Sequence, residues 1–194
     1  MSIFLETDRL ALRRFSESEG DVDRLLGLDN DPDVMRFING GRPTTRDAIR
    51  TEVLPRFLHD CPCIGDRVFW AAEERGTGQF LGWFVLRPLE DHSCAVVELG
   101  YRLRRAAWGR GLATEGSLAL IRKGFTELGV QRVTANTMTV NSRSRRVMEK
   151  AGLRYVRTFF EEWPDVIEGS GLGDVEYALT KADWELREAR QRTP

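Results

Sequence analysis

Hydrophobic and polar positions along the chain change repeatedly between two spacings, one typical of strands and one typical of helices. Alternating or short apolar runs predict strands at residues 9–15, 67–73, 79–86, 94–103, 131–137, 153–160 and 174–180. Apolar residues three and four positions apart predict helices at residues 18–30, 32–38, 44–61, 112–128 and 142–151. This mixed order predicts an α/β (α+β) protein, a mixed sheet with helices on its faces.

The helix expected to begin near Thr44 precedes a segment with candidate metal ligands. Thr44 and Asp47 have the spacing of a capping box, and Pro62 would end the helix. The segment His59 to Cys63 could be interpreted instead as a partial zinc site. Its spacing fits no common zinc pattern, however, and the sequence has one other histidine, His92. We therefore predict a helix end and no metal.

The composition is that of an ordinary globular domain. Of 194 residues, 41% are hydrophobic and 30% are charged. We expect one domain over residues 1–194, with a core at 7–184 and a tail at 185–194. The charged run at 183–192 is expected to form a frayed helix. No apolar run approaches the ~20 residues of a membrane span and no signal segment is recognised, which predicts a cytoplasmic protein without membrane contact. An odd number of cysteines, three, argues against a disulfide framework.

The most informative segment joins the strand at 94–103 to the helix that follows it. Residues 104–115 read Arg-Arg-Ala-Ala-Trp-Gly-Arg-Gly-Leu-Ala-Thr-Glu. The first N–H groups of a helix have no intrahelical partner and the helix dipole is positive there, which favours an anion by roughly 0.3–1 kcal/mol. Gly109 and Gly111 let the backbone approach a ligand closely. The segment therefore predicts a phosphate site, with a solvated loop as the alternative.

Positive charge gathers at this loop although the chain as a whole is nearly neutral. Four arginines stand at positions 102, 104, 105 and 110 with no acid among them, whereas the formal net charge is −1. Such a local patch fits an anionic ligand, and the near-neutral total argues against nucleic acid. The chain has no Gly-x-x-x-x-Gly-Lys-Ser/Thr segment, so a P-loop nucleotide enzyme is the weaker interpretation.

Other motifs accompany the loop in a defined order. They are Thr7-Asp8-Arg9-Leu10-Ala11-Leu12-Arg13, Glu98-Leu99-Gly100-Tyr101, Ala113-Thr114-Glu115 and the segment 141–153. Together with Trp108-Gly109-Arg110-Gly111-Leu112-Ala113 they resemble the GNAT superfamily of N-acetyltransferases, and its RimJ/RimL-like branch in particular. In that family the loop binds the pyrophosphate of acetyl-CoA, with Gln or Arg in many members where this chain has Trp108. The resemblance spans about residues 7–184.

The resemblance implies a mostly antiparallel sheet in which the strands at 96–103 and 131–138 splay apart and hold acetyl-CoA. Backbone groups in such a split lack partners, so a ligand that pairs with them binds well. The residues implied in binding acetyl-CoA are Leu99, Tyr101, Arg104, Arg105, Gly109, Arg110, Gly111, Ala113, Thr114 and Asn141. No metal is implied. Three helix arginines are interpreted as solvated charges, with the 3′-phosphate of CoA as the alternative partner: Arg143, Arg145 and Arg146.

Direct attack of a primary amine on the thioester, in a ternary complex, needs a neutral amine and is helped by a general base. Glu98 is the candidate, since strand alternation puts it on the face of Gly100, where apolar surroundings would make it a stronger base. Its family counterparts often act through water. The alternative is a sheet carboxylate paired with Arg132 or Arg102. Backbone N–H groups of residues 99–101 would meet the oxyanion.

Asn141 and Ser144 open a short helix three positions apart, so one can cap the helix while the other stands at its third position. Ser144 shares a helical face with Val147 and Met148, which predicts that it points inward. By resemblance, Asn141 bonds the pantetheine arm and Ser144 lies near the thioester sulfur. Ser144 would protonate the leaving thiolate or only position the sulfur, with Tyr101 a weaker rival.

The acceptor amine is expected to enter between residues 30–43 and the loop 161–173, with Phe37, Glu162 and Trp163 as the candidate substrate-binding residues. The stretch 161–171 carries four acids and a tryptophan without a basic residue, so it either attracts a cation or is a solvated loop. The branch implies acetylation of a protein N-terminus. Small-molecule acceptors such as a polyamine, an amino sugar or an antibiotic, and a non-catalytic acyl-CoA-binding protein, remain alternatives; a homodimer is also left open.

Overall fold

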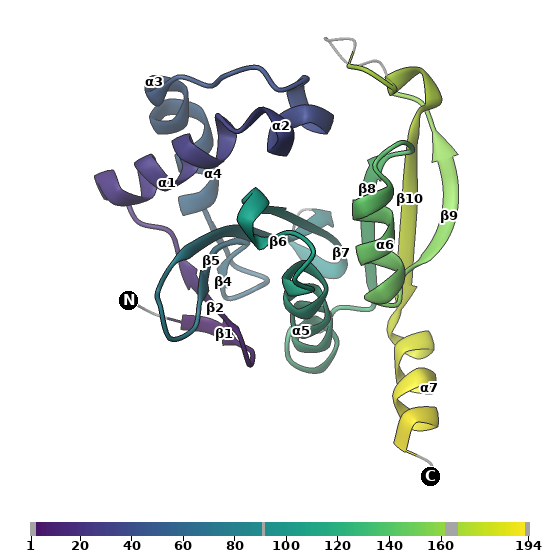
Figure 1. The fold of residues 1–194 in the computed structure, drawn as a ribbon. Coiled ribbons are helices and arrows are strands. Elements are labelled where there is room, and N and C mark those ends of the chain that lie inside the picture. The colour runs from purple at the N-terminus through teal and green to yellow at the C-terminus, as the bar shows by residue number, and fades with distance from the viewer. Residues whose placement is uncertain (1–2, 91, 162–166, 193–194) are drawn as a thin grey trace.

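A single eight-stranded sheet organises the molecule (Figure 1). The computed structural model describes residues 3–90, 92–161 and 167–192. The strands of the sheet are β1 (Ile3–Glu6), β2 (Leu10–Arg14), β5 (Phe69–Glu74), β6 (Phe80–Glu90), β7 (Ser93–Leu103), β8 (Arg132–Met138), β9 (Arg154–Phe159) and β10 (Asp174–Thr180). Their order is β1-β2-β5-β6-β7-β8-β10-β9. Every neighbouring pair is antiparallel except β7 and β8, which are parallel, so the expected mostly antiparallel mixed sheet is confirmed.

Helices cover both faces of this sheet. The α-helices are α1 (Glu19–Asp29), α2 (Pro32–Asn39), α3 (Arg46–Ala48), α4 (Leu54–Leu58), α5 (Leu112–Glu127), α6 (Ser142–Lys150) and α7 (Lys181–Arg192). Figure 1 shows α1–α4 gathered on one side of the sheet and α5 and α6 on the other. Each side has its own cluster of buried apolar residues.

Strand alternation decides which side chains of β7 face which layer of helices. Val97 and Leu99 are buried in the larger cluster together with residues of α5. On the same face of the neighbouring strand lies Phe84, whose ring leaves no room for a side chain at Gly116 of α5. Gly100 points to the opposite face, toward the layer of α1–α4. A small hairpin, β3 (Asp60–Cys61) and β4 (Asp66–Arg67), lies outside the main sheet.

The helix expected over residues 44–61 is shorter and interrupted. Thr45, not Thr44, is the cap, because its hydroxyl accepts a hydrogen bond from the N–H of Ala48 at 3.1 Å. After α3 the chain makes a π-turn over Ile49–Val53, where Leu54 N–H bonds the carbonyl of Ile49. Pro55 explains the wide turn, since its ring excludes a regular helical bond at that position.

Two further helix expectations at this point are wrong. Asp47 forms no capping box with Thr44, whose N–H instead donates to Oδ1 of Asn30 at 2.8 Å. The helix ends at Leu58, and Pro62 lies in the turn of the β3–β4 hairpin rather than at a helix end. Local sequence favoured a helix, whereas pairing between Asp60 and Arg67 decides the structure.

The argument against a disulfide is also wrong. Cys63 in the β3–β4 hairpin and Cys94 at the start of β7 form one, across 31 residues of sequence. Cys61 is the free cysteine, and its sulfur lies 3.6 Å from that of Cys63. An odd number of cysteines rules out pairing of all three, but it does not rule out one bridge.

The C-terminal segment is a helix joined directly to the last strand. It begins at Lys181, two residues before the charged run expected as a frayed helix. Trp184 packs on Phe125 of α5, with ring centroids 5.5 Å apart, and Arg187 donates to the carbonyl of Gly152 at 2.5 Å. These contacts bind the beginning of α7 to the body of the protein. Within the described ranges, no helix has the length and apolar character needed to cross a membrane.

Candidate active site

The two parallel strands at the centre of the sheet separate after a short stretch of pairing. The register of β7 with β8 runs from Val96 opposite Arg132 to Glu98 opposite Thr134. Beyond these residues β7 continues to Leu103 on the β6 side, and β8 continues to Met138 on the β10 side. Figure 1 shows the two halves of the sheet diverging at this place. The expected split is therefore present. Its two strand edges, residues 99–103 and 135–138, are not paired with each other.

The glycine loop, residues 104–111, connects β7 to α5 at the end of this split. Gly109 and Gly111 have φ of 72° and 78°, in the left-handed region that favours glycine. Gly111 is the residue before α5, and no side chain caps this helix. Trp108 fixes the loop by donating from Nε1 to the carbonyl of Leu103 at 2.8 Å. The first N–H groups of α5, including those of Ala113 and Thr114, thus stand at an open helix start suited to phosphate.

A set of charge-assisted bonds holds the start of α5 against the first hairpin. Glu115 in the first turn of α5 accepts from the Thr7 hydroxyl at 2.5 Å, the Arg9 backbone N–H at 2.9 Å and Arg9 Nε at 2.6 Å. Burial alone would raise the pKa of Glu115, but these donors outweigh it and the pKa is lowered. The motifs at residues 7–13 and 113–115 are therefore partners in space, a role that the sequence did not reveal.

The arginines of the loop have unequal surroundings. Arg105 is ion-paired with Asp33 of α2, and Arg110 is ion-paired with Glu74 of β5. Arg104 lines, with these two arginines, a hollow of 320 Å³ beside the loop. Along the sequence no acid stands among the four arginines, but in space carboxylates from other elements pair with three of them: Arg102, Arg105 and Arg110.

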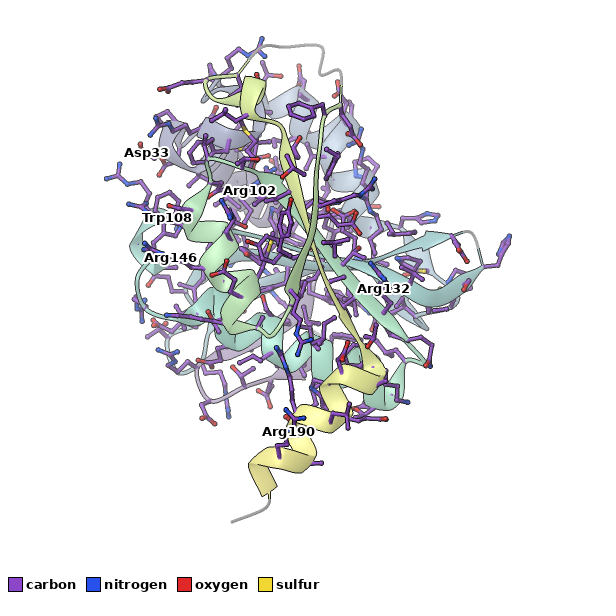
Figure 2. The ribbon with its side chains drawn as sticks, turned by 90° about the vertical axis from the view of Figure 1, so that its right-hand side faces the viewer. Asp33, Arg102, Trp108, Arg132, Arg146 and Arg190 are labelled. Atoms are coloured by element: carbon purple, nitrogen blue, oxygen red, sulfur yellow. A yellow bond between two sulfur atoms is a disulfide. The ribbon has the colours of Figure 1, made fainter. Side chains whose placement is uncertain are left out.

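The helix α6 brings further charge to the glycine loop. The guanidinium of Arg143 lies over the ring of Trp108, 5.0 Å from its centroid. In the view of Figure 2, Arg146 lies at the same edge of the molecule as Trp108. Arg145 instead turns inward and donates to the Tyr177 hydroxyl at 3.2 Å and the Thr139 carbonyl at 3.1 Å. The interpretation of all three as solvated charges is thus wrong for Arg145, whereas Arg143 is exposed as expected.

Two hydroxyl groups meet across the split on the side of α5 and α6. The Tyr101 hydroxyl lies 3.0 Å from Oγ of Ser144 and donates to the Ser144 carbonyl at 3.1 Å. Burial raises the pKa of Tyr101 to about 12, opposed by the bond to Ser144. Asn141 caps α6 by accepting from the N–H of Ser144 at 3.2 Å, and it donates to Thr137 Oγ1 at 3.0 Å. The predicted cap and the inward direction of Ser144 are confirmed.

Glu98 lies on the opposite face of β7 and has a partner that the sequence did not indicate. Arg87, its cross-strand neighbour on β6, donates from Nη2 to Glu98 Oε2 at 2.5 Å. The side chain of Glu98 is 24% exposed. The alternative interpretation, a sheet carboxylate paired with an arginine, is therefore confirmed, although both named partners are wrong: Arg102 pairs with Asp29 at 2.5 Å, and Arg132 lies 3.5 Å from Glu176. Pairing across strands depends on register, which sequence alone does not define.

The two segments expected to admit the acceptor do face each other. Arg36 of α2 pairs with Glu168 at 3.1 Å, which connects α2 to the segment before β10. Phe37 is partly buried, and the Arg36 guanidinium lies 5.2 Å from its ring centroid. The other two substrate-binding candidates, Glu162 and Trp163, lie outside the described residues.

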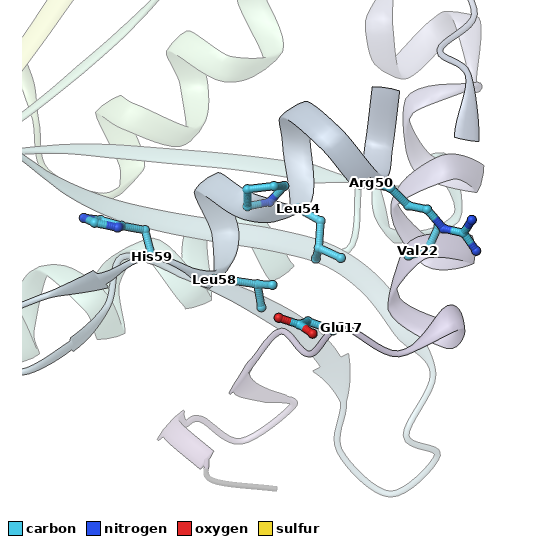
Figure 3. A pocket seen from close by; sticks show the side chains of 7 residues that line it. Glu17, Val22, Arg50, Leu54, Leu58 and His59 are labelled. Atoms are coloured by element: carbon cyan, nitrogen blue, oxygen red, sulfur yellow. The ribbon is translucent and has the colours of Figure 1, made fainter. Parts of the chain in front are cut away.

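Among the described residues, neither candidate metal ligands nor a further hollow add anything to this site. The described part of the chain contains no group of three or more histidine, cysteine, aspartate or glutamate side chains that could hold a metal ion. A hollow of 540 Å³ opens between the start of α1 and α4, and none of its lining residues belongs to the split (Figure 3). Its lining combines apolar side chains with an ion-paired arginine and consists of Glu17, Val22, Arg50, Leu54, Pro55, Leu58 and His59.

Comparison with known proteins assigns the family. The model of the acetyltransferase (GNAT) domain matches residues 9–154, and the chain belongs to this family. It is an acyl-CoA-dependent N-acetyltransferase that uses acetyl-CoA. A protein of Aspergillus fumigatus named FsC-acetyl coenzyme A-N(2)-transacetylase is 36% identical over 170 residues, which cover 82% of this chain and 69% of that protein.

Solved structures agree on the fold. An acetyltransferase of the GNAT family from Bacillus anthracis has a TM-score of 0.75 at 23% identity, covering 93% of this chain and 99% of that one. The spermidine N-acetyltransferase from Vibrio cholerae, solved with CoA and spermine, has a TM-score of 0.72 at 16% identity and covers 92% of this chain and 99% of its own. At these identities the likeness supports the fold and leaves the acceptor open.

Proposed function

We propose that the protein transfers the acetyl group of acetyl-CoA to the primary amine of a small molecule, by direct attack while both substrates are bound. The observation that carries this proposal is the split of β7 and β8 with the Tyr101–Ser144 hydroxyl pair across it. A thioester lying in the split would have its sulfur on the side of these hydroxyls. The amine would approach from the opposite face, where Glu98 and α2 lie.

In the proposed complex, backbone groups make the main contacts with acetyl-CoA, and arginines add positive charge near its phosphates. The open start of α5 with Gly109 and Gly111 receives the pyrophosphate. The strand edges at Leu99 to Tyr101 pair with the pantetheine arm, and Asn141 borders the same space from α6. Arg104 and Arg143 supply positive charge toward the phosphates. The motifs at residues 7–13 and 113–115, on which the proposed RimJ/RimL-like branch rests, are joined by the bonds of Thr7 and Arg9 to Glu115.

The residues proposed to transfer protons lie on the two opposite faces of β7. When the amine attacks, its nitrogen becomes cationic and the thioester oxygen becomes an oxyanion, which the backbone N–H groups of residues 99–101 stabilise. Glu98 accepts the ammonium proton through a water molecule. When the intermediate collapses, the C–S bond breaks and the thiolate receives a hydrogen bond from Ser144, supported by Tyr101. With a pKa of about 12 Tyr101 stays protonated at neutral pH, so it acts as a hydrogen-bond donor.

A small-molecule acceptor is favoured over a protein N-terminus by the Aspergillus fumigatus relative. Its name assigns acetyl transfer to a numbered nitrogen, N(2), of FsC, and this relative is more similar in sequence than the solved structures described above. Transfer to small-molecule amines is thus the function that we propose for this chain. Which amine is acetylated is determined by testing a panel of amines.

The test is a panel of amines incubated with acetyl-CoA, read by CoA release and by the mass of the acetylated product. The panel contains an α-amino amide, an alkylamine, a polyamine, an amino sugar and a short peptide with a free N-terminus. We expect turnover of at least one small amine, and no acetylated protein when acetyl-CoA is present alone. Exclusive turnover of the peptide would contradict the small-molecule acceptor, and an acetylated enzyme intermediate would contradict direct attack.

A further inference from the structure

The fold brings all three cysteines of the chain together, although the proposed chemistry uses none of them. Cys61 ends β3, Cys63 stands in the turn of the β3–β4 hairpin, and Cys94 is the second residue of β7. Cys63 and Cys94 are joined by the disulfide, whereas Cys61 keeps a free thiol. A thiol beside a disulfide is a reactive combination, because disulfides exchange by attack of a thiolate on one of their sulfurs.

The turn of the hairpin holds the free thiol against one sulfur of the disulfide. The carbonyl of Cys61 accepts hydrogen bonds from the N–H groups of Ile64 at 3.1 Å and Gly65 at 3.0 Å, which closes the turn around Cys63. The sulfur of Cys61 lies 3.6 Å from that of Cys63. The two sulfurs are thus in contact without a bond, and Cys63 is the disulfide sulfur that the free thiol reaches.

The three cysteines differ in their exposure to solvent. Cys61 and Cys63 are partly exposed, whereas Cys94 is 8% exposed and belongs to the larger buried cluster. The attacking group in exchange is the thiolate, which forms more readily where water reaches the sulfur than in apolar surroundings. Cys61 is therefore placed to attack. Burial of Cys94 hinders a thiol from solution, but it does not hinder a thiol that is already in contact with Cys63.

We propose that Cys61 is an exchange thiol that moves the disulfide from Cys63–Cys94 to Cys61–Cys63. In this step the Cys61 thiolate attacks Sγ of Cys63, a bond between these two sulfurs forms, and the bond between Cys63 and Cys94 breaks. Cys94 leaves as a thiolate and takes up the proton that Cys61 lost. One disulfide and one thiol are present before and after the step, so it consumes no oxidant and no reductant.

The exchange changes how the hairpin is attached to the sheet. A bridge at Cys63–Cys94 ties the hairpin covalently to β7, the strand that also carries Glu98. A bridge at Cys61–Cys63 lies within the hairpin and leaves β7 without a covalent link to it. The strand of the proposed active site therefore loses or regains this link by an internal reaction. The inference is independent of the acceptor amine and of the proposed proton transfers.

The test maps the bridges of the purified protein after incubation in a mildly alkaline buffer without reductant. Acid then stops exchange by protonating the thiols, and peptic digestion with mass spectrometry assigns each bridge. We expect two species, one with the Cys63–Cys94 bridge and a free thiol at Cys61, and one with the Cys61–Cys63 bridge and a free thiol at Cys94. Iodoacetamide added before the acid should accordingly label Cys94 as well as Cys61.

Cys61→Ser removes the attacking thiol with little change in size. We expect it to lower the labelling of Cys94 at least tenfold and to leave only the Cys63–Cys94 bridge. The matched control combines Cys61→Ser with Asp60→Cys, which restores the number of thiols. Asp60 precedes Cys61 in the strand and its side chain is 77% exposed, so a thiol there points to the opposite face from Cys63. This control should not restore the labelling of Cys94.

Cys94→Ser tests whether the second bridge can close, and it should form the Cys61–Cys63 bridge on oxidation by air. Failure to do so would overturn the inference. So would a Cys63–Cys94 bridge alone in the unmodified protein, or equal labelling of Cys94 with and without Cys61. Labelling of all three cysteines in the absence of reductant would show that no bridge is present, and the inference would fail with it. Melting temperatures identify any variant that has lost its fold.

Discussion

At the scale of single residues, Tyr101 and Ser144 come from different elements and meet because β7 and α6 both border the split. Helical spacing was sufficient to predict that Ser144 points inward. The partner of Glu98 was not predictable, because Arg87 becomes its neighbour only through the register of β6 with β7. Residue roles that follow from local periodicity can therefore be predicted from sequence, whereas roles that depend on cross-strand pairing cannot.

Removing the Tyr101 hydroxyl tests the role of the hydroxyl pair. We expect Tyr101→Phe to lower kcat by about tenfold to a hundredfold, because the leaving thiolate loses part of its hydrogen-bond support. The affinity for acetyl-CoA, measured by calorimetry, should stay within a factor of about two. Ser144→Ala should act in the same direction, and the double variant should lose less than the product of the single losses. An unchanged kcat in both single variants would exclude the pair from the reaction.

A buried ion cluster that joins β2 to α1 gives a prediction for acid stability. Burial alone would raise the pKa of Asp21, but bonds from Arg13, Arg24 and the Ser16 N–H hold it at about 2, below its ordinary 3.8. Because the pKa of Asp21 is lower in the folded protein, the ionised carboxylate stabilises the fold at pH values above its ordinary pKa. This contribution to stability is lost as the pH falls through the lowered pKa. We expect about 2 kcal/mol of unfolding free energy to disappear between about pH 4 and pH 2.

Asp21→Asn is the variant that checks this assignment. It should be less stable than the unmodified protein at pH 7, and its unfolding free energy should decline less over the same acid range. Urea denaturation at a series of pH values measures both quantities. A variant with the same acid-dependent slope as the unmodified protein would show that Asp21 is not the group responsible.

At the scale of elements, most strands and helices follow from hydrophobic spacing, and the departures have identifiable causes. Pro55 widens a helix into a π-turn, and the β3–β4 hairpin replaces an expected helix end. The glycine loop was predictable because its glycines, its arginines and the helix after it are contiguous in sequence. Its connection to the first hairpin through Glu115 was not, since more than a hundred residues separate the partners.

Substitutions at Gly111 test the loop as an anion site. Asp and Asn have the same shape and both tolerate a positive φ better than other side chains, so they differ mainly in charge. We expect Gly111→Asp to weaken acetyl-CoA binding at least tenfold more than Gly111→Asn, because a carboxylate at the start of α5 repels the pyrophosphate. Calorimetric titration of both variants measures the difference. Equal effects of the two substitutions would mean that the loop does not face a phosphate.

At the scale of the whole molecule, the disulfide connects the β3–β4 hairpin to the strand that carries the site. Cys63 and Cys94 are 31 residues apart in sequence, and a cross-link of that span stabilises a fold by about 3–4 kcal/mol in the chain-entropy model. We expect Cys94→Ser to lower the unfolding free energy by about 2–4 kcal/mol in the absence of reductant. Cys61→Ser is the control and should change it little. Equal stability of the Cys94→Ser variant and the unmodified protein would exclude the cross-link in solution.

Hydrophobic spacing was sufficient to predict a mixed sheet with helices on its faces. The split between two strands was predicted only from the resemblance to a known family. Composition and periodicity do not show which strands are parallel, and the split exists because β7 and β8 are the one parallel pair among the described strands. The acceptor side depends on contacts such as Arg36 with Glu168, which join segments far apart in sequence. These contacts are properties of the folded molecule.

The most direct test of this account is amide hydrogen exchange with and without saturating acetyl-CoA. If the split receives the pantetheine arm, exchange should slow at residues 99–103 and 135–138 and also at 109–115, the glycine loop and the start of α5. Adenosine 3′,5′-bisphosphate, which lacks that arm, should slow exchange at 109–115 alone. Unchanged exchange at both strand edges under saturating acetyl-CoA would contradict the central claim that the diverging strands form the acetyl-CoA site.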